Sequence, residues 1–264
     1  MKKTIMGLCA AGSLLFAQQG SATLLDAIAG YEGPLFFNLS GYSQSIRDGE
    51  TWGVITVNGV FSDQNMTVAN RLWVSSATDQ IYGTFYGLTD NYVSAIETGY
   101  SIGLQGGGFT IYQTSGGVDL LAGPNGRIGE AGYVGMGDDV LAYGMFDSGA
   151  NPGNSLVTLM QTVLNANSPT SGQGLGYGSL LGGSLYDFLH TGLIMDDSGN
   201  YHDMLLSFNV MPPKAGAAEA GWSQSLTDPI EMHAGNSVPE PATMALFGLG
   251  LVSLAGLYRR KLKN

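Results

Sequence analysis

Apolar and polar residues alternate along much of the chain, a pattern typical of short strands that bury one face. The clearest case is residues 202–210, where Met204, Leu206, Phe208 and Val210 fall on one face. Similar runs predict seven further strands. They span residues 35–42, 52–61, 71–75, 80–88, 109–114, 118–122 and 140–146.

Glycine and polar residues between these runs predict how the strands connect. Glycine accounts for 41 of the 264 residues but has no fixed period, which excludes collagen-like and solenoid folds. Asn58-Gly59 indicates a turn or a bulge. Residues 77–79 and 115–117 each predict a turn through which the flanking strands pair.

One segment has helical spacing instead. The apolar residues at 156, 159, 160, 163 and 164 recur every three to four positions, and Asn154 or Ser155 can cap a helix that ends by residue 167. A second short helix is expected around residues 184–190. The sequence therefore predicts an all-β single domain, a β-sandwich or jelly roll, with one or two inserted helices.

The N-terminus has the features of an export signal. Lys2 and Lys3 precede an apolar run over residues 5–17, and the small residues Gly20 and Ala22 predict cleavage ahead of Thr23. Residues 1–22 are therefore expected to be a signal peptide. Cys9 lies inside the apolar run without the small preceding residue that a lipoprotein signal needs, and its removal leaves a chain without cysteine.

The C-terminus combines three features in order: Val238-Pro239-Glu240-Pro241, an uncharged apolar run over residues 242–258, and a basic cluster. The basic residues are Arg259, Arg260, Lys261 and Lys263. The two prolines keep the first segment extended, as a protease substrate must be. The apolar run can lie in lipid only as a helix, which at about 1.5 Å per residue spans roughly 25 Å. The basic cluster favours a cytoplasmic C-terminus.

This tail over residues 238–264 resembles the PEP-CTERM sorting signal. That signal occurs on surface and exopolysaccharide-associated proteins of Gram-negative bacteria and is processed by a membrane protease called exosortase. The resemblance implies an exosortase-type protease as partner, the inner membrane as a temporary anchor, and the cell surface or extracellular matrix as destination. A tail anchor that is never cut is the alternative.

The two targeting segments leave a passenger that we divide into a β-rich domain, residues 23–210, and a linker, residues 211–237. If the Gly221-Trp222 stretch belongs to the domain, Trp222 packs back on the strands and the free tether starts at Ile230. Residues 23–237 carry four basic residues against 20 acidic ones, because Glu240 is the only one of the 21 acidic residues outside them. Such a surface repels nucleic acid, which we exclude as a partner.

Candidate chemistry is sparse. No catalytic motif is present, and no catalytic residue is assigned. The oxygen-bearing residues Asp196, Ser198, Asn200 and Asp203 could bind calcium, although a hairpin turn explains the same residues. No other metal or cofactor is expected.

We therefore expect a non-enzymatic exported surface or exopolysaccharide-matrix protein. The alternatives are a carbohydrate-binding or calcium-binding module, for which Trp52, Trp73 and Trp222 offer aromatic surfaces, and a secreted hydrolase whose carboxylates converge in the fold.

Overall fold

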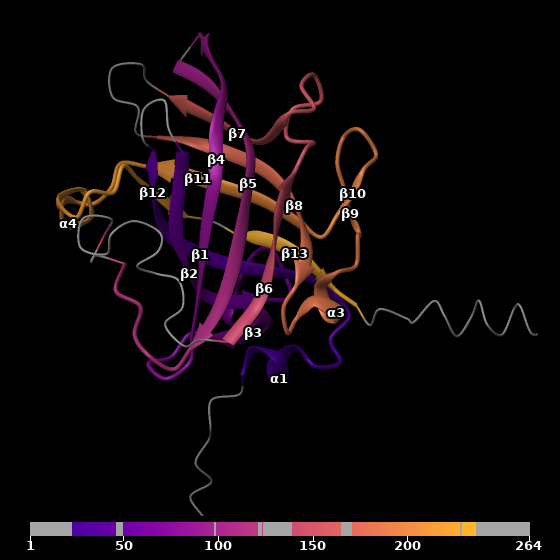
Figure 1. The fold of residues 1–264 in the computed structure, drawn as a ribbon. Coiled ribbons are helices and arrows are strands. Elements are labelled where there is room, and N and C mark those ends of the chain that lie inside the picture. The colour runs from indigo at the N-terminus through magenta and orange to yellow at the C-terminus, as the bar shows by residue number, and fades with distance from the viewer. Residues whose placement is uncertain are drawn as a thin grey trace, which may run out of the picture.

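The computed structural model describes residues 23–45, 50–97, 99–120, 123, 139–164, 171–227 and 229–235. Within these ranges most of the chain is strand, and the helices are short (Figure 1). The strands are β1 (Gly33–Ser45), β2 (Glu50–Phe61), β3 (Arg71–Val74), β4 (Gln80–Ile96), β5 (Gly99–Thr114), β6 (Asp139–Asp147), β7 (Val157–Leu164), β8 (Ser171–Gly182), β9 (Ile194–Met195), β10 (Tyr201–His202), β11 (Met204–Met211), β12 (Gln224–Thr227) and β13 (Ile230–Ala234). The helices are α1 (Leu24–Ile28), the 3-10 helix η1 (Val68–Asn70), α3 (Tyr186–Leu189) and α4 (Ala215–Glu219). The all-β class is confirmed.

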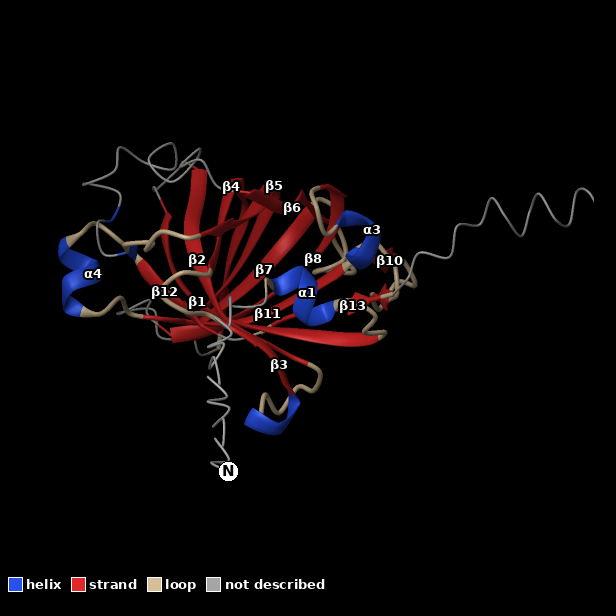
Figure 2. Ribbon diagram, turned by 90° about the horizontal axis from the view of Figure 1, so that it is seen from below, coloured by secondary structure: helices blue, strands red, loops and turns tan. Residues whose placement is uncertain are grey.

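The main sheet closes on itself. Of the described strands, all but β9 and β10 form one antiparallel sheet, and β1 pairs with β2 on one side and with β12 and β13 on the other. Opposite walls of this sheet face a shared interior, as the two layers of the expected sandwich would, but hydrogen bonds join them into one continuous sheet (Figure 2). The closure depends on pairings between the two ends of the domain.

Three positions in the closed sheet are each filled by two strands in tandem. β3 and β4 both pair with β2, β6 and β7 both pair with β5 and β8, and β12 and β13 both pair with β1 and β11. Eleven strands therefore occupy eight positions around the described sheet. Two of the interruptions contain a proline, Pro152 and Pro229, and proline cannot donate to a ladder.

The tandem arrangement overturns the expected hairpin between residues 71–75 and 80–88. The turn at residues 77–79 does form, and Ser76 N donates to Asp79 O at 2.9 Å. The strands on either side nevertheless continue in the same direction along β2. Asp79 fixes this turn, because its carboxylate accepts hydrogen bonds from Trp73 Nε1 at 2.9 Å and Gln113 Nε2 at 2.6 Å.

Two further predictions of local structure are wrong. The helix expected over residues 154–167 is strand β7 where it is described, because Leu159, Gln161 and Val163 alternate into the interior and the segment is rich in β-branched residues. Asn154 accepts from Leu156 N, which makes it a turn residue. Residues 118–120 form no strand, so the hairpin expected at residues 115–117 is absent there.

Other local predictions are confirmed. β1 and β2 shift register opposite Asn58, which is the bulge that Asn58-Gly59 indicated. The short helix near residues 184–190 is α3. Strand β11 turns Met204, Leu206 and Phe208 toward the interior as expected.

The boundary expected at residue 210 requires correction. Residues in the expected linker form α4, β12 and β13, and Ile230, Met232 and Ala234 are buried in the main core. Trp222 does pack back as expected, 5.2 Å from Trp52 between ring centroids. Residues 23–235 therefore contain the closed sheet from its first strand to its last.

Helix α1 covers one end of the closed sheet (Figures 1 and 2). Thr23 and Asp26 form a reciprocal capping box at its start. Leu24 and Ile28 from this helix are buried in the main core together with residues of the late strand β13. The first and last described elements thus share one core.

Candidate functional site

A polar network lies beside α3 and the β9–β10 hairpin. His202 is buried, with its side chain 4% exposed, and its ring contacts two carboxylates: Nδ1 lies 3.0 Å from Asp147 Oδ2 and Nε2 lies 3.3 Å from Asp196 Oδ2. Ser179 Oγ donates to Asp147 Oδ2 at 2.5 Å. The Tyr177 ring stacks on the imidazole with centroids 4.7 Å apart.

The contacts of His202 limit its chemistry. Carboxylates only accept hydrogen bonds, so both contacts are hydrogen bonds only when both ring nitrogens carry a proton. Ser179 donates its hydrogen bond to Asp147, and Asp147 lies between Ser179 and His202. This differs from the order of a nucleophilic triad, in which the serine bonds to the histidine. The arrangement holds strands β6 and β8 and the β9–β10 hairpin together.

Asp196 acts as the centre of the hairpin turn. Its Oδ1 accepts from Ser198 N and Asn200 N, both at 2.8 Å, and its Oδ2 accepts from Asn200 Nδ2 at 2.9 Å. The side-chain hydrogen bond from Asn200, with those from the Asn200 and Ser198 backbone and from His202, lowers the pKa of Asp196 to about 2. Burial and the charges of Asp197 and Asp196 raise the pKa of Tyr177.

Asp203 forms a separate anchor. Its carboxylate is buried and accepts from Leu180 N at 2.9 Å, Gly192 N at 2.9 Å and His190 Nδ1 at 2.8 Å. Asp196 and Asp203 thus face different partners, and the four calcium candidates do not converge on one point. In the described ranges no group of three acidic, histidine or cysteine side chains is placed to hold a metal. The alternative explanation, a hairpin turn, is confirmed by the β9–β10 pairing.

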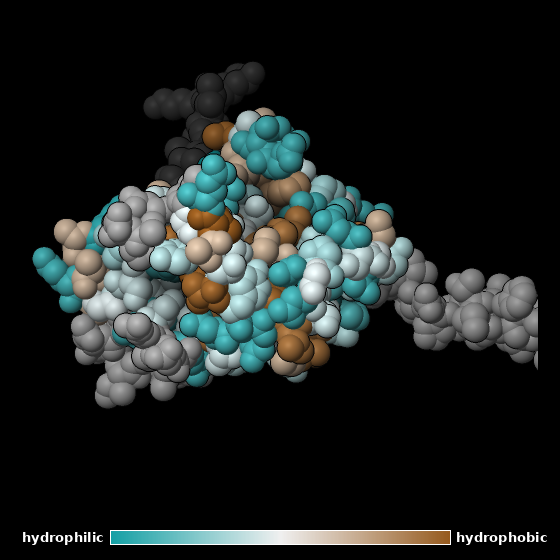
Figure 3. All heavy atoms as spheres, turned by 90° about the horizontal axis from the view of Figure 1, so that it is seen from above, coloured by the Kyte–Doolittle hydropathy of each residue, from teal (hydrophilic) through white to brown (hydrophobic). Residues whose placement is uncertain are grey.

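The three tryptophans are all buried. Trp52 is 6% exposed, Trp73 4% and Trp222 3%. Trp73 belongs to the main core, whereas Trp52 and Trp222 form a second cluster with Tyr42. None of them offers an open ring face to a sugar. On the face seen in Figure 3, hydrophobic residues reach the surface in several small groups among hydrophilic ones.

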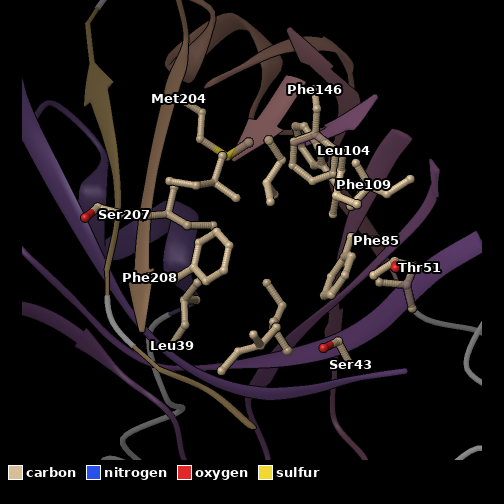
Figure 4. Close-up of a pocket in the computed structure, with 18 of the residues that line it drawn as sticks. Leu39, Ser43, Thr51, Phe85, Leu104, Phe109, Phe146, Met204, Ser207 and Phe208 are labelled. Atoms are coloured by element: carbon tan, nitrogen blue, oxygen red, sulfur yellow. The ribbon is translucent and has the colours of Figure 1, made fainter. Parts of the chain in front are cut away.

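The interior of the closed sheet contains a cavity of about 80 Å³. Phenylalanine, leucine and methionine side chains point toward one shared space from opposite walls (Figure 4). Two of the phenylalanines lie over glycines: a Cβ at Gly53 or Gly174 would collide with the ring of Phe85 or Phe208. These glycines let the rings lie against the wall instead of filling the interior.

The expected sorting residues 238–241 and 259–261 and the expected apolar helix over residues 242–258 lie outside the described residues, as does the signal peptide. A family model described as the PEP-CTERM protein-sorting motif matches residues 237–261. The chain carries a PEP-CTERM sorting motif. No curated protein and no solved structure matches it.

The PEP-CTERM motif indicates an exported protein that is sorted by exosortase, a membrane protease. Among the helices that the structure describes, none has the length and apolar character to cross a membrane. The sorting motif is identified from the sequence of residues 237–261, the same tail in which the sequence predicted it.

Two features of the described domain were not predictable from the sequence. His202 and Asp147 are 55 residues apart, and no motif links them in the sequence. The cavity depends on strand closure, which no local pattern encodes. The Asp-rich hairpin was the only sequence signal that pointed near the polar network.

Proposed function

We propose that this chain is a non-enzymatic protein of the cell surface or extracellular matrix. It is exported, held in the inner membrane by residues 242–258 with its C-terminus in the cytoplasm, and cut by exosortase near Pro239-Glu240-Pro241. The observation that carries the proposal is the sorting-motif match at residues 237–261. In this tail an extended motif, an apolar run and a basic cluster follow in the order that presents the motif on the outer face.

The described domain supports the non-enzymatic part of the proposal. Its histidine and aspartate side chains in the polar network hydrogen-bond to one another and to backbone amides. Such contacts hold the β9–β10 hairpin and the segment after α3 against the sheet, which is a structural role. The acidic passenger also suits a protein that stays soluble among polysaccharides and divalent cations outside the cell.

The test is the intact mass of the protein recovered from the surface or medium of an exporting Gram-negative host that has an exosortase. Wild type is compared with the double variant Pro239→Ala/Pro241→Ala and with Pro213→Ala, a control proline change outside the motif. We expect wild type and the control to end near residues 238–242, and the double variant to keep its tail. An uncut tail in wild type would leave a permanently anchored β-domain and refute the exosortase step.

A further inference from the structure

Three large apolar side chains are exposed on one face of the β9–β10 hairpin. Leu193 and Met195 are each 60% exposed, and Tyr201 is 68% exposed. Leu193 and Met195 are two positions apart, and Tyr201 pairs with Met195 across the hairpin, so the three side chains project from the same face. The opposite face is buried through Ile194 and His202. An exposed apolar group of this kind, here named the hairpin patch, marks an interaction surface.

The hairpin patch lies beside the point where the chain leaves the domain. Gly235, the last described residue, donates a backbone hydrogen bond to Phe188 O of α3 at 3.0 Å. Thr191 Oγ1 donates to His233 O of β13 at 3.3 Å, and Leu193 follows only two residues later. Figures 1 and 2 show α3, β10 and the end of β13 on the same side of the molecule. The chain therefore continues toward the sorting motif from a point next to the hairpin patch.

The length of the tail brings this side of the domain to a membrane. This step rests on the proposed function, in which residues 242–258 span the inner membrane before cleavage. Only residues 236–241 separate Gly235 from that span, and six residues reach at most roughly 20 Å when fully extended. Strand β8 alone is roughly 40 Å long at about 3.3 Å per residue, so the domain cannot turn its far end to the lipid. The side that carries the hairpin patch faces the membrane at short range.

The chemistry of the hairpin patch fits a neutral lipid surface. A tyrosine with neighbouring aliphatic side chains is a combination that lies well at the boundary between headgroups and acyl chains. Of the hairpin carboxylates, Asp196 and Asp203 are buried and hydrogen-bonded, whereas Asp197 in the turn is exposed. Residues 191–203 contain no lysine or arginine. The attraction therefore comes from apolar burial, and anionic headgroups should weaken it.

We propose that the hairpin patch docks on the outer surface of the inner membrane while the tail is uncut. Leu193, Met195 and Tyr201 enter the headgroup region and orient the domain. The sorting motif, between the domain and the span, is then held at the lipid surface where a membrane protease acts. A single lipid chain gives only marginal membrane binding, so three partly buried side chains cannot hold the domain alone. Cleavage of the tail therefore releases the domain from the membrane.

The test uses the uncut chain, residues 23–264, in vesicles of phosphatidylethanolamine and phosphatidylcholine that contain a nitroxide-labelled headgroup lipid. This chain has no cysteine, so Ser198→Cys in the β9–β10 turn and Ser94→Cys near the β4–β5 tip each take one fluorescent dye, the hairpin dye and the tip dye. Both serines are exposed. The β4–β5 tip lies beside the start of β8, and α3 follows the end of β8, so the tip dye is far from the tail. We expect nitroxide to quench the hairpin dye strongly and the tip dye weakly.

Two double variants separate the hairpin patch from exposed apolar residues in general. Leu193→Ser/Met195→Ser should lower the ratio of docked to free domains by roughly 25-fold, at about fivefold for each side chain kept out of the lipid surface. Val93→Ser/Ile96→Ser removes two exposed apolar residues near the β4–β5 tip and should leave quenching of the hairpin dye unchanged. The comparison of the two dyes in the unaltered patch needs neither variant and stands if one fails to fold.

Flotation of the vesicles in a density gradient separates this inference from the proposed function. An uncut chain that does not float with the vesicles would overturn the membrane stage of the proposed function, and the docking with it. A chain that floats, but whose hairpin dye is quenched no more than its tip dye or equally in both double variants, would overturn the docking alone. Ser198→Cys chains that form disulfide-linked dimers faster than Ser94→Cys chains would assign the hairpin patch to a second copy and also overturn it.

Discussion

Asp203→Ala should be the most damaging single change in the polar network. Asp203 is 1% exposed, and its carboxylate accepts from two backbone amides, Leu180 N on β8 and Gly192 N after α3. The third donor, His190, is half-exposed and can turn to water. The substitution leaves two backbone donors without a partner.

The magnitude follows from these two donors. A buried donor left unsatisfied costs about 1–3 kcal/mol, and Leu180 N lies in the buried part of the network, whereas Gly192 N is only partly buried. We therefore expect a loss of about 3 kcal/mol in the free energy of unfolding. For a domain of about 200 residues this corresponds to a fall in Tm of roughly 6–12 °C.

The assay is urea unfolding of residues 23–235, followed by circular dichroism, with Asp197→Ala as the control. Asp197 is exposed and lies in the neighbouring turn, so its removal should change the free energy by no more than about 0.5 kcal/mol. Asp203→Asn should fall between the two, because its carbonyl oxygen still accepts one bond. A loss below about 1 kcal/mol for Asp203→Ala would show that water replaces the carboxylate, and the reasoning would fail.

Three other predictions concern the hairpin, the cavity wall and the second aromatic cluster. The pKa of Asp196 in the folded chain is about 2, below its ordinary 3.8. The stabilisation that the ionised carboxylate provides is therefore complete above about pH 4 and is lost as the pH falls toward 2. The urea midpoint should fall less steeply between about pH 5 and 2 in Asp196→Asn than in wild type. Gly174→Ala should cost about 1–3 kcal/mol, because the new methyl meets the Phe208 ring, and Phe208→Leu in the same chain should recover part of the loss in a double-mutant cycle. Trp222→Ala should lower the free energy of unfolding by about 3–5 kcal/mol. Trp222→Phe should lower it by about 1 kcal/mol, because it loses mainly the hydrogen bond that the indole donates to Leu120 O at 2.8 Å. Equal losses for the two variants in thermal melts would contradict this.

The strand content was predictable because alternation is a local property. On β11, Met204 and Val210 are buried whereas Ser207, on the opposite face, is exposed, which is the pattern that a strand against a core must show. The same reasoning failed at residues 157–164, where apolar positions fit a helical period and a strand period equally well. There the neighbouring strands β5 and β8 decided the outcome, by offering hydrogen bonds on both sides.

The linker prediction failed for a related reason. Pro212, Pro213 and several alanines separate residue 211 from Trp222, and such composition is typical of a tether. β13 nevertheless supplies the strand that closes the sheet between β1 and β11, over 190 residues after β1 begins. A local window cannot show that an early strand lacks a neighbour.

The sequence by itself determined where this protein goes and that its domain is built of strands. A sorting signal is recognised from its linear order of residues, so residues 238–261 carry the information without the fold of the domain. The tertiary structure alone decided the closure of the sheet, the contacts of His202 and Asp203, and the apolar cavity inside the sheet. Each of these brings together residues that are distant in sequence, and such contacts arise from the packing of the whole chain.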